Sequence, residues 1–489
     1  MTIGRVLGNA IGLVSTLIIA ALLIPEHFGL FALATTFVTV FSAAIDFQTS
    51  LVLIQMKDPK KQDFDTVFTL NILRGCLLFF VIAAAAWPLA VVLDDQRLFP
   101  LLLAHALQPL IMGIRNPYFE KYAKEVSFVP STVLDLIVKV ATFTGTVGVA
   151  LIYPTYWALL CGVLAAAIAS SAFTFIMAKE RPGWSLASFK TVFSFSAWLG
   201  LAALARAVMS QSDRLILGIG FSIVMLGYYM MAVRIIDQII QALQQPINWA
   251  LYSGFSKVKD DPERLQRNYK RAHAAMAALL VPASMGLLLV AEPFVLTFLG
   301  EKWQMSILFC QVTALIALIM ALPGPSWPLA MSLAETRLLF WRTVVTLGIR
   351  LAAQLIGIIT YGIPGFLVGC VVAVAINNVI AMQVVKHLIN ATYVSQLLNV
   401  WRPVAASMLM IPAVLLTAAS LDGHVQGWLS LGAQVAAGLA AYGLTTLVFW
   451  TISGFPEGPE RMVIKQAELI LRKLRILPEL DRPTESRVD

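Results

Sequence analysis

The sequence predicts an all-α integral membrane protein with about fourteen transmembrane helices. We expect two pseudo-symmetric six-helix lobes around a central cavity, plus two extra C-terminal helices. Three observations predict this fold class: long apolar segments, basic residues that fill every second gap between them, and a weak internal repeat. Of the 489 residues, 59% are hydrophobic and 13% are charged, a composition typical of chains that lie mostly in lipid.

Each apolar segment can cross a hydrocarbon core of about 30 Å, which needs roughly 20 helical residues. Backbone polar groups in lipid must bond within their own segment, so each segment is predicted to be a helix. The predicted spans are, in order, 6–24, 28–54, 68–93, 98–119, 128–152, 155–178, 191–219, 223–249, 273–298, 304–332, 338–359, 363–389, 403–421 and 427–452.

Lysine and arginine gather in alternate gaps between these spans. The basic segments are the N-terminus with Arg5, the tail after 453, and the gaps 55–67, 120–127, 179–190, 250–272, 333–342 and 386–402. The other gaps hold only Arg97 and Lys302. Because cytoplasmic loops carry the excess of basic residues, both termini are predicted to be cytoplasmic. Basic loops beside anionic lipid also account for the net charge of +8, so we expect no nucleic-acid partner.

The internal repeat aligns the first helices with the seventh and eighth. Gly29-Leu30-Phe31 falls on Gly227-Tyr228-Tyr229, and Ala34 falls on Ala232 at the same offset. Six helices return the chain to its starting side, so two such lobes would form a parallel repeat about an axis along the membrane normal. The predicted domains are an N-lobe of residues 1–180 (helices 1–6), a C-lobe of 181–390 (helices 7–12), helices 13–14 in 391–453, and a cytoplasmic amphipathic helix and tail in 454–489.

Two helices are expected outside the bilayer. Residues 255–272 predict a cytoplasmic helix, with Asp261 as its cap and Pro262 in its first turn. Residues 459–477 carry apolar side chains on one face and basic ones elsewhere, which favours an interfacial helix over a solvated tail helix.

Polar residues form one stripe along the predicted helix 223–249. They recur at helical spacing and lie within about 60° of one another around the axis. They are Arg234, Asp237, Gln238, Gln241, Gln245 and Asn248. Lipid would not tolerate this face, so it lines either a water-filled cavity or a polar contact between helices. The cavity is favoured, because six polar groups exceed what one packing seam needs.

Three other helices carry polar faces. Helix 191–219 carries Arg206, Ser210, Asp213 and Arg214 on nearly one face. Helix 28–54 carries Thr35, Thr39, Ser42, Asp46 and Thr49, and the first helix carries Gly8, Gly12, Ser15 and Thr16. Small residues also serve ordinary close packing between membrane helices, which is the competing explanation for the first helix.

The charges in the spans predict a net positive cavity. Asp135 with Lys139, and Arg234 with Asp237, have the spacing of helical pairs, and Asp213 can offset Arg206 or Arg214. Arg350 has no acid near it in the sequence. An excess of arginine favours an anionic solute such as a phosphate or an acidic sugar. The candidates for ion coupling are Asp46, Asp135, Lys139 and Asp237. Tyr228, Tyr229 and Trp249 could stack on sugar rings or serve packing.

Signals for an enzyme are weak. The sequence has no nucleotide-binding GxxxxGK[ST] and no HExxH. Its four cysteines all lie in predicted spans without metal-ligand spacing. Asp63-Phe-Asp65 resembles the DxD of metal-dependent glycosyltransferases, but it lies in a short basic loop. We therefore expect no catalytic activity, no cofactor and no metal.

Several stretches, in order and spacing, resemble a known family. They are Gly4-Arg5-Val-Leu-Gly-Asn9, Pro25-Glu-His-Phe-Gly-Leu30, Leu53-Ile-Gln55, Phe64 to Gly75, Phe193 to Trp198, Asp213-Arg214, Gly227-Tyr-Tyr229, Phe255 to Arg271, and Gly300-Glu-Lys-Trp303. Over residues 4–390 the chain resembles Wzx-type flippases and exopolysaccharide exporters of the polysaccharide transporter family. The superfamily also contains multidrug/toxin extruders and lipid II flippases. A Gly-rich run usual after Asp46 is replaced here by Phe47-Gln-Thr-Ser50, which argues against a hinge at that turn.

The resemblance implies two lobes that form a V around a cavity in the bacterial inner membrane. It implies alternating access that moves an undecaprenyl diphosphate-linked oligosaccharide to the periplasmic leaflet, for exopolysaccharide, capsule or O-antigen synthesis. Arg206, Arg234 and Arg350 would attract its diphosphate or acidic sugars. The implied partners are this lipid-linked oligosaccharide, the bilayer, and a polysaccharide polymerase with export machinery. The alternatives are a multidrug extruder, a polymerase or glycosyltransferase, and a non-transporting scaffold.

Overall fold

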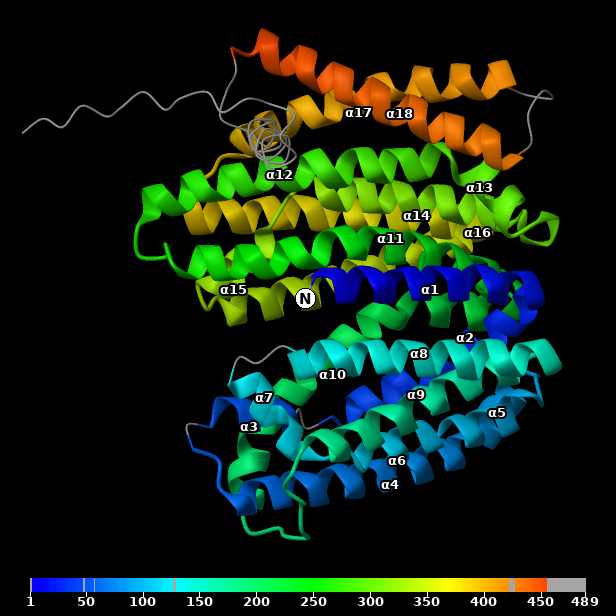
Figure 1. Ribbon diagram of the computed structural model, residues 1–489, viewed down its shortest axis with the longest axis vertical. Helices are drawn as coiled ribbons and strands as arrows, with labels where there is room; N and C mark the ends of the chain where they lie inside the picture. Colours follow the sequence, from blue (N-terminus) through cyan, green and yellow to red (C-terminus); the bar gives the residue numbers. More distant parts are fainter. Residues whose placement is uncertain (1, 47–48, 57, 126–128, 422–426, 455–489) are drawn as a thin grey trace, which may run out of the picture.

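Every regular element in the described part of the computed structural model is a helix (Figure 1). The structure describes residues 2–46, 49–56, 58–125, 129–421 and 427–454. Many large apolar side chains of these helices face outward, among them Phe80, Ile359 and Leu439. Such exposure fits helices whose outer faces contact lipid, so the predicted all-α membrane fold is confirmed.

The N-terminal part of the chain forms nine α-helices and one 3₁₀ turn. They are α1 (Thr2–Leu22), α2 (Pro25–Ala44), α3 (Thr49–Gln55), α4 (Lys61–Val92), α5 (Leu98–His105), α6 (Leu107–Gly113), η1 (Pro117–Phe119), α7 (Glu120–Lys124), α8 (Val129–Ile152) and α9 (Tyr156–Met177).

The rest of the described chain continues as nine α-helices and one 3₁₀ turn. They are α10 (Phe189–Gly220), α11 (Ile223–Ser256), α12 (Pro262–Leu289), α13 (Ala291–Phe298), η2 (Glu301–Trp303), α14 (Ser306–Ala321), α15 (Ser326–Ser332), α16 (Thr336–Ile389), α17 (Tyr393–Leu421) and α18 (Gly427–Ile452).

Nine helices of the described residues are long and apolar enough to cross a membrane, or eleven if each bent pair is one span. The bent pairs bend by 59° after Gly113 and by 45° after Ala321, inside two spans predicted as single segments. The predicted count of fourteen therefore stays a prediction.

The long helix α16 is two helical arms joined at Gly362, which has φ 63° and ψ −136°. A Cβ on Gly357 would lie 2.1 Å from the carbonyl oxygen of Gly365, and one on Gly369 would lie 2.4 Å from that of Ala353. The two arms therefore fold back against each other as an antiparallel pair. Their ranges match the separately predicted spans 338–359 and 363–389.

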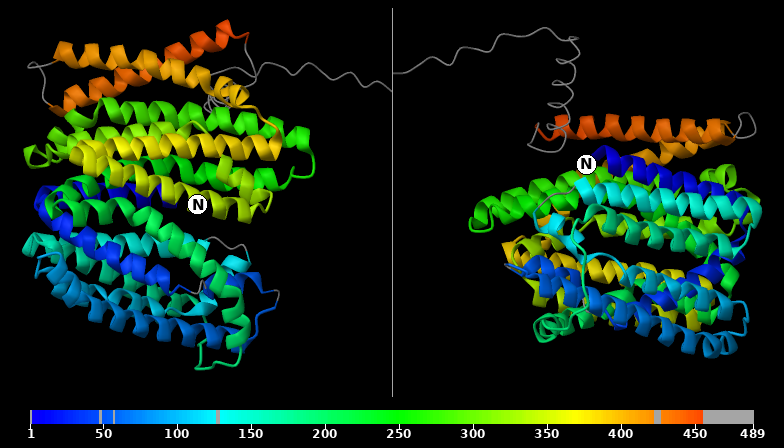
Figure 2. Two further views of the ribbon diagram at one scale, coloured as in Figure 1. Left: turned by 180° about the vertical axis from the view of Figure 1, so that it is seen from behind. Right: turned by 60° about the horizontal axis from the view of Figure 1, so that its bottom comes forward.

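The helices gather in two groups (Figures 1 and 2). The N-terminal group contains α4, α5, α6, α8 and α9, and the C-terminal group contains α11, α12, α14 and α16. Helices α1, α2 and α10 lie between the groups, while α17 and α18 pack outside the C-terminal group against α12 and α13. This arrangement matches the expected two groups with two added helices. The exact lobe boundaries remain a prediction.

The loop between α11 and α12 corrects one expectation. Asp261 caps α12 as predicted, with its Oδ1 accepting the N–H of Arg264 at 2.9 Å. Residues 255–272, however, are not a separate cytoplasmic helix, because they hold the end of α11 and the first turns of the continuous α12. The predicted interfacial helix 459–477 lies outside the described residues.

Candidate substrate site between the helix groups

The two helix groups meet tightly at the end of the bundle where α1 turns into α2, here called the Pro25 end. A Cβ on Gly29 would lie 1.7 Å from the carbonyl oxygen of Ile223, and one on Gly227 would lie 1.8 Å from that of Pro25. The internal repeat aligns Gly29 with Gly227, and by the same offset it aligns Pro25 with Ile223. The contact between α2 and α11 is therefore symmetric, as expected of two-fold related helices.

The turn η2 of the C-terminal part closes over the same end. Trp303 is fully buried, and its indole N–H donates to the carbonyl oxygen of Ala20 at 2.9 Å. The ammonium of Lys302 donates to the carbonyl oxygen of Ala21 at 2.6 Å. Phe28 packs edge-on against the indole, with ring centroids 5.3 Å apart. The end of α1 is therefore held by side chains distant in sequence.

Arg97 lies at the Pro25 end as well. Its guanidinium pairs with Glu26 and with Asp95, each at 2.7 Å. Hydrogen bonding to Arg97 lowers the pKa of the Asp95 carboxyl below its usual value. Arg97 and Lys302, the exceptions to the alternation of basic gaps, both bind the region where α1 turns into α2.

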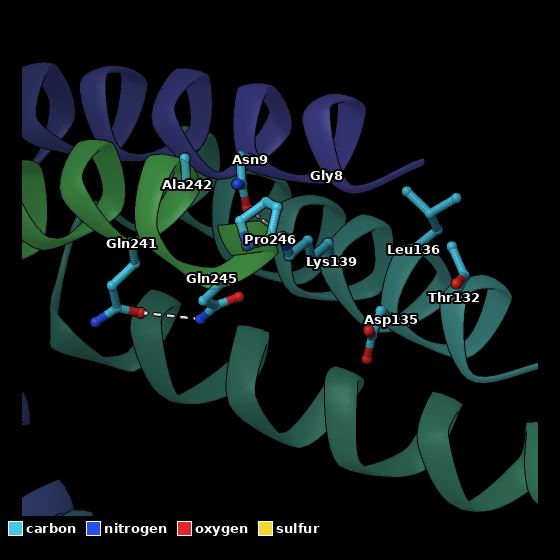
Figure 3. Close-up of a pocket in the computed structure, with 10 residues that line it drawn as sticks. All are labelled: Gly8, Asn9, Thr132, Asp135, Leu136, Lys139, Gln241, Ala242, Gln245 and Pro246. Atoms are coloured by element: carbon cyan, nitrogen blue, oxygen red, sulfur yellow. Dashed lines mark hydrogen bonds between the residues drawn. The ribbon is translucent and has the colours of Figure 1, made fainter. Parts of the chain in front are cut away.

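Toward the other end of α1, here called the Gly8 end, polar side chains line a pocket of about 260 Å³ (Figure 3). Its lining is Gly8, Asn9, Thr132, Asp135, Leu136, Lys139, Gln241, Ala242, Gln245 and Pro246. These residues come from α1, α8 and α11, so four predicted site residues (Asp135, Lys139, Gln241 and Gln245) meet there. The small residue Gly8 of α1 leaves room for the side chain of Lys139. A Cβ at Gly8 would lie 2.9 Å from Lys139 Nζ, which is too close.

The partners of Lys139 differ from the expected ones. Its ammonium donates to Asn9 Oδ1 at 2.9 Å, and the described residues give it no ion pair with Asp135. Asn9 was not among the predicted site residues. Its amide in the apolar first span, inside the stretch Gly4 to Asn9 that carries the family resemblance, is the signal that could have found it.

Gln238 connects the stripe of α11 to α1. The hydroxyl of Thr16 donates to Gln238 Oε1 at 3.4 Å, and a Cβ on Gly12 would lie 3.1 Å from Gln238 Nε2. The polar face of α11 therefore packs partly against α1 near the middle of the bundle. It borders the pocket at Gln241 and Gln245, so the polar face of α11 takes part both in a helix contact and in a pocket.

Arg350 is not an isolated cation, in contrast to the expectation from sequence. Its guanidinium pairs with Asp213 of α10 at 2.5 Å, so Asp213 does not pair with Arg206 or Arg214. The same carboxylate accepts from the hydroxyl of Tyr229 at 2.5 Å and from the amide of Gln354 at 2.6 Å. Asp213 is only 6% exposed. This network joins α10, which lies between the helix groups, to α11 and α16 of the C-terminal group.

Three of the four predicted site arginines have no acid partner among the described residues. They are Arg206, Arg214 and Arg234. Arg214 donates to Gln211 Oε1 at 2.8 Å, which also accepts from the hydroxyl of Thr36 at 3.2 Å. Arg234 is half-buried on α11, while the nearby Asp237 is exposed. The predicted pair of Arg234 with Asp237 is therefore absent from this part of the structure.

The other predicted residues lie apart from the pocket lining. Asp46, at the end of α2, pairs with Arg74 of α4 at 2.6 Å. Arg206 and Ser210 are exposed on α10, and Asn248 is half-buried on α11. Tyr229 is buried as a donor to Asp213, so it does not present its ring for stacking.

The Asp63-Phe-Asp65 stretch has structural partners. Asp63 Oδ2 accepts the N–H of Lys60 at 2.7 Å in a capping box at the start of α4. Asp65 is buried and accepts the N–H of Gly183, in the linker between α9 and α10, at 2.8 Å. Among the described residues, no group of three or more His, Cys, Asp or Glu side chains could hold a metal ion. Both carboxylates are thus engaged in stabilising α4 and the linker.

Comparison with known proteins identifies relatives across most of the chain. The lipopolysaccharide biosynthesis protein WzxC of Escherichia coli is 24% identical over 411 residues, covering 83% of this chain and 84% of the relative. The succinoglycan biosynthesis transport protein ExoT of Rhizobium meliloti is 24% identical over 448 residues, covering 89% of this chain and 88% of the relative.

A solved structure shares the fold. The lipid II flippase MurJ in an inward closed conformation superimposes with a TM-score of 0.72 at 13% identity, over 92% of this chain and 98% of that one. The family model described as "Polysaccharide biosynthesis protein" matches residues 18–308, more than half of the chain. The resemblance carried by the sequence motifs is thereby confirmed, and the chain belongs to the polysaccharide biosynthesis protein family.

Proposed function

We propose that this protein flips a lipid-linked oligosaccharide, carried on undecaprenyl diphosphate, across the bacterial inner membrane for exopolysaccharide, capsule or O-antigen synthesis. The observation that carries the proposal is the placement of Arg214 and Arg234 within a membrane bundle, without acid partners among the described residues. Helix α11, which carries Arg234, also lines an amide-rich pocket. Unpaired cations in a span are costly unless they meet water or an anionic ligand. The names of WzxC, ExoT and MurJ support the same class of cargo.

The transport cycle follows from the two ends of the bundle. The Gly8 end holds the open pocket, and the Pro25 end is closed by the α2–α11 contact and by Trp303. With both termini in the cytoplasm, this state faces inward and receives the cargo from the cytoplasmic leaflet. Arg214 and Arg234 hold the diphosphate, because a guanidinium can donate two parallel hydrogen bonds to a phosphate. Opening the Pro25 end then releases the cargo on the far side.

Coupling to an ion gradient would use the carboxylates that face the cavity. Asp135 lines the pocket and Asp237 is exposed beside Arg234 on α11. Asp46 is the weaker candidate, because its carboxylate is paired with Arg74. We propose that Asp135, with Lys139, and Asp237 carry the coupling.

The alternatives fit the site less well. A multidrug extruder of cationic compounds would have to hold its cargo against unpaired arginines. A glycosyltransferase would need free carboxylates, whereas Asp63 and Asp65 are engaged in capping and in the linker. A non-transporting scaffold, which could still join a polymerase and export machinery, would leave the cavity arginines dispensable.

A flipping assay tests the proposal. Purified protein is placed in liposomes with fluorescent undecaprenyl-diphosphate oligosaccharide, and outer-leaflet accessibility is followed with and without a pH gradient. Arg234→Ala should reduce flipping about 10- to 100-fold, because losing a charge-assisted hydrogen bond costs about 1.5–3 kcal/mol. The matched control is Arg267→Ala, which removes an exposed arginine of α12 that pairs with the exposed Glu263 at 3.7 Å.

Two results would contradict the proposal. Wild-type protein that is folded but moves no lipid-linked oligosaccharide would exclude the cargo. Equal flipping by wild type and Arg234→Ala would exclude the arginine site, although the proposed cargo would still stand. Transport of a cationic dye in parallel liposomes would instead support the extruder alternative.

A further inference from the structure

The pocket at the Gly8 end is chemically unlike the arginine cluster. Its titratable lining residues are one base and one acid, Lys139 and Asp135, so it has no net charge. Its other polar side chains are the amides of Asn9, Gln241 and Gln245 and the hydroxyl of Thr132. A diphosphate carries several negative charges and would meet the carboxylate of Asp135 here. The pocket therefore suits a neutral ligand rich in both donors and acceptors.

Sugar hydroxyls match this lining. Each hydroxyl both donates and accepts, and each side-chain amide offers two donor hydrogens and two acceptor lone pairs. Gln241 and Gln245 are exposed in the pocket and bond to each other at 3.4 Å, a long contact that leaves most of their capacity free. Figure 3 shows both amides beside the space that Asp135 borders from α8.

Pro246 adds a backbone acceptor. Proline has no N–H, so the carbonyl oxygen of Ala242 cannot receive the usual helical hydrogen bond from residue 246. Both residues line the pocket. A break in the hydrogen bonding of a membrane helix beside a cavity is where substrate groups bind in many transporters.

The size of the pocket limits what it can hold. Sites for drug-sized ligands occupy roughly 300–1,000 Å³. A volume of about 260 Å³ therefore admits a single sugar ring rather than the whole oligosaccharide.

The pocket is shared between helices whose spacing changes during the proposed transport cycle. Asn9 comes from α1 and Lys139 from α8, whereas Gln241 and Gln245 come from α11 of the C-terminal group. A change in the spacing of α8 and α11 would divide these polar groups. A ligand can therefore contact all of these polar groups only in the conformation described here.

We infer that this pocket is a sugar subsite, in which Gln241, Gln245, Lys139 and Asp135 bind one uncharged ring of the oligosaccharide while the arginines bind the diphosphate. The inference rests on the proposed flippase function and assigns a separate determinant of cargo specificity. The subsite releases the ring when the spacing of α8 and α11 changes as the Pro25 end opens.

Binding to the full-length protein in detergent tests the assignment. The probes are undecaprenyl diphosphate alone and undecaprenyl diphosphate carrying glucose, galactose or N-acetylglucosamine, measured by native mass spectrometry and thermophoresis. The double variant Gln241→Ala/Gln245→Ala should lower the affinity for the preferred sugar-bearing lipid about tenfold, since two neutral hydrogen bonds are lost. Affinity for the bare diphosphate lipid should change less than about twofold. The matched control is Gln244→Ala, on the same helix but outside the pocket lining.

The outcomes separate this inference from the proposed function. Wild-type protein that binds bare and sugar-bearing lipids equally, or a double variant that weakens both equally, overturns the sugar subsite and leaves the flippase proposal standing. Wild-type protein that binds no undecaprenyl diphosphate lipid at all overturns both. Loss of sugar preference in Gln244→Ala as well would show that the change in α11, and not the pocket, causes the effect.

Discussion

Asp213 and Arg350 show how much the fate of a charge depends on distant residues. The two residues are 137 positions apart and form a buried pair supported by Tyr229 and Gln354. The sequence suggested closer arginines as partners for Asp213, because local spacing was the only geometric information available. The helix spacing of Gln354, one turn after Arg350, is the signal that could have indicated a polar face on this arm of α16.

Breaking the Asp213–Arg350 pair should destabilise the protein strongly. Arg350→Ala leaves a buried carboxylate without its cation, a change that typically costs about 3–5 kcal/mol. The expected result is a clear drop in the thermal unfolding midpoint of the purified protein, measured by fluorescence in detergent. Arg350→Ala combined with Asp213→Asn should recover part of the loss, because no unpaired charge remains. A single variant as stable as wild type would mean that water, and not Arg350, balances Asp213.

At the scale of elements, glycines set how closely helices approach. Gly29 and Gly227 let α2 and α11 touch backbone to backbone, and Gly357 and Gly365 do the same for the two arms of α16. The alignment of Gly29 with Gly227 was visible in the sequence as a sign of the repeat. The folded structure was needed to show that these two glycines also contact each other. A sequence alignment does not indicate which of its repeat-related positions lie at the two-fold axis between the repeats.

Adding a side chain at the α2–α11 contact should loosen the Pro25 end. In Gly227→Ala the new Cβ would meet the carbonyl oxygen of Pro25 at 1.8 Å, so the helices must separate. A cysteine in place of Thr16, which is fully buried, should then react faster with a membrane-impermeant thiol reagent. The measurement uses protein whose native cysteines are replaced by serine.

The control for this experiment is Gly148→Ala on α8, where no heavy atom lies within 4 Å of the added Cβ. Faster labelling in Gly227→Ala but not in Gly148→Ala would support closure by the α2–α11 contact. Unchanged labelling in Gly227→Ala, with intact fold, would show that Trp303 and its neighbours keep the end closed without it.

The whole molecule has an orientation that the loops predict. Basic residues gather in alternate gaps, and the exceptions, Arg97 and Lys302, are bound at the Pro25 end by Glu26, Asp95 and the end of α1. Their local hydrogen bonds explain why two basic residues lie on the side that otherwise lacks them. Orientation itself is set by the membrane and cannot be read from the packing of helices.

Reporter fusions should place the C-terminus in the cytoplasm and the connection between α17 and α18 on the opposite side. A fluorescent protein fused after the last residue should be fluorescent, and alkaline phosphatase inserted between α17 and α18 should be active. The physical reason is the retention of Lys- and Arg-rich loops on the cytoplasmic side. An active phosphatase at the C-terminus would mean that the number of spans is odd or that the orientation is reversed.

The sequence by itself determined the fold class, the positions of most spans and the family. Apolar length and backbone hydrogen bonding leave helices as the available choice in lipid, so local composition is sufficient. It also indicated Gln241 and Gln245 as cavity residues, and Asp135 and Lys139 as a pair and as candidates for ion coupling. Only the tertiary structure decided their partners: Lys139 with Asn9, Arg350 with Asp213, and Asp46 with Arg74. Charge pairing in a membrane bundle depends on which helices pack together. Helix periodicity shows which residues share a face of one helix, but it does not show which neighbouring helix packs against that face.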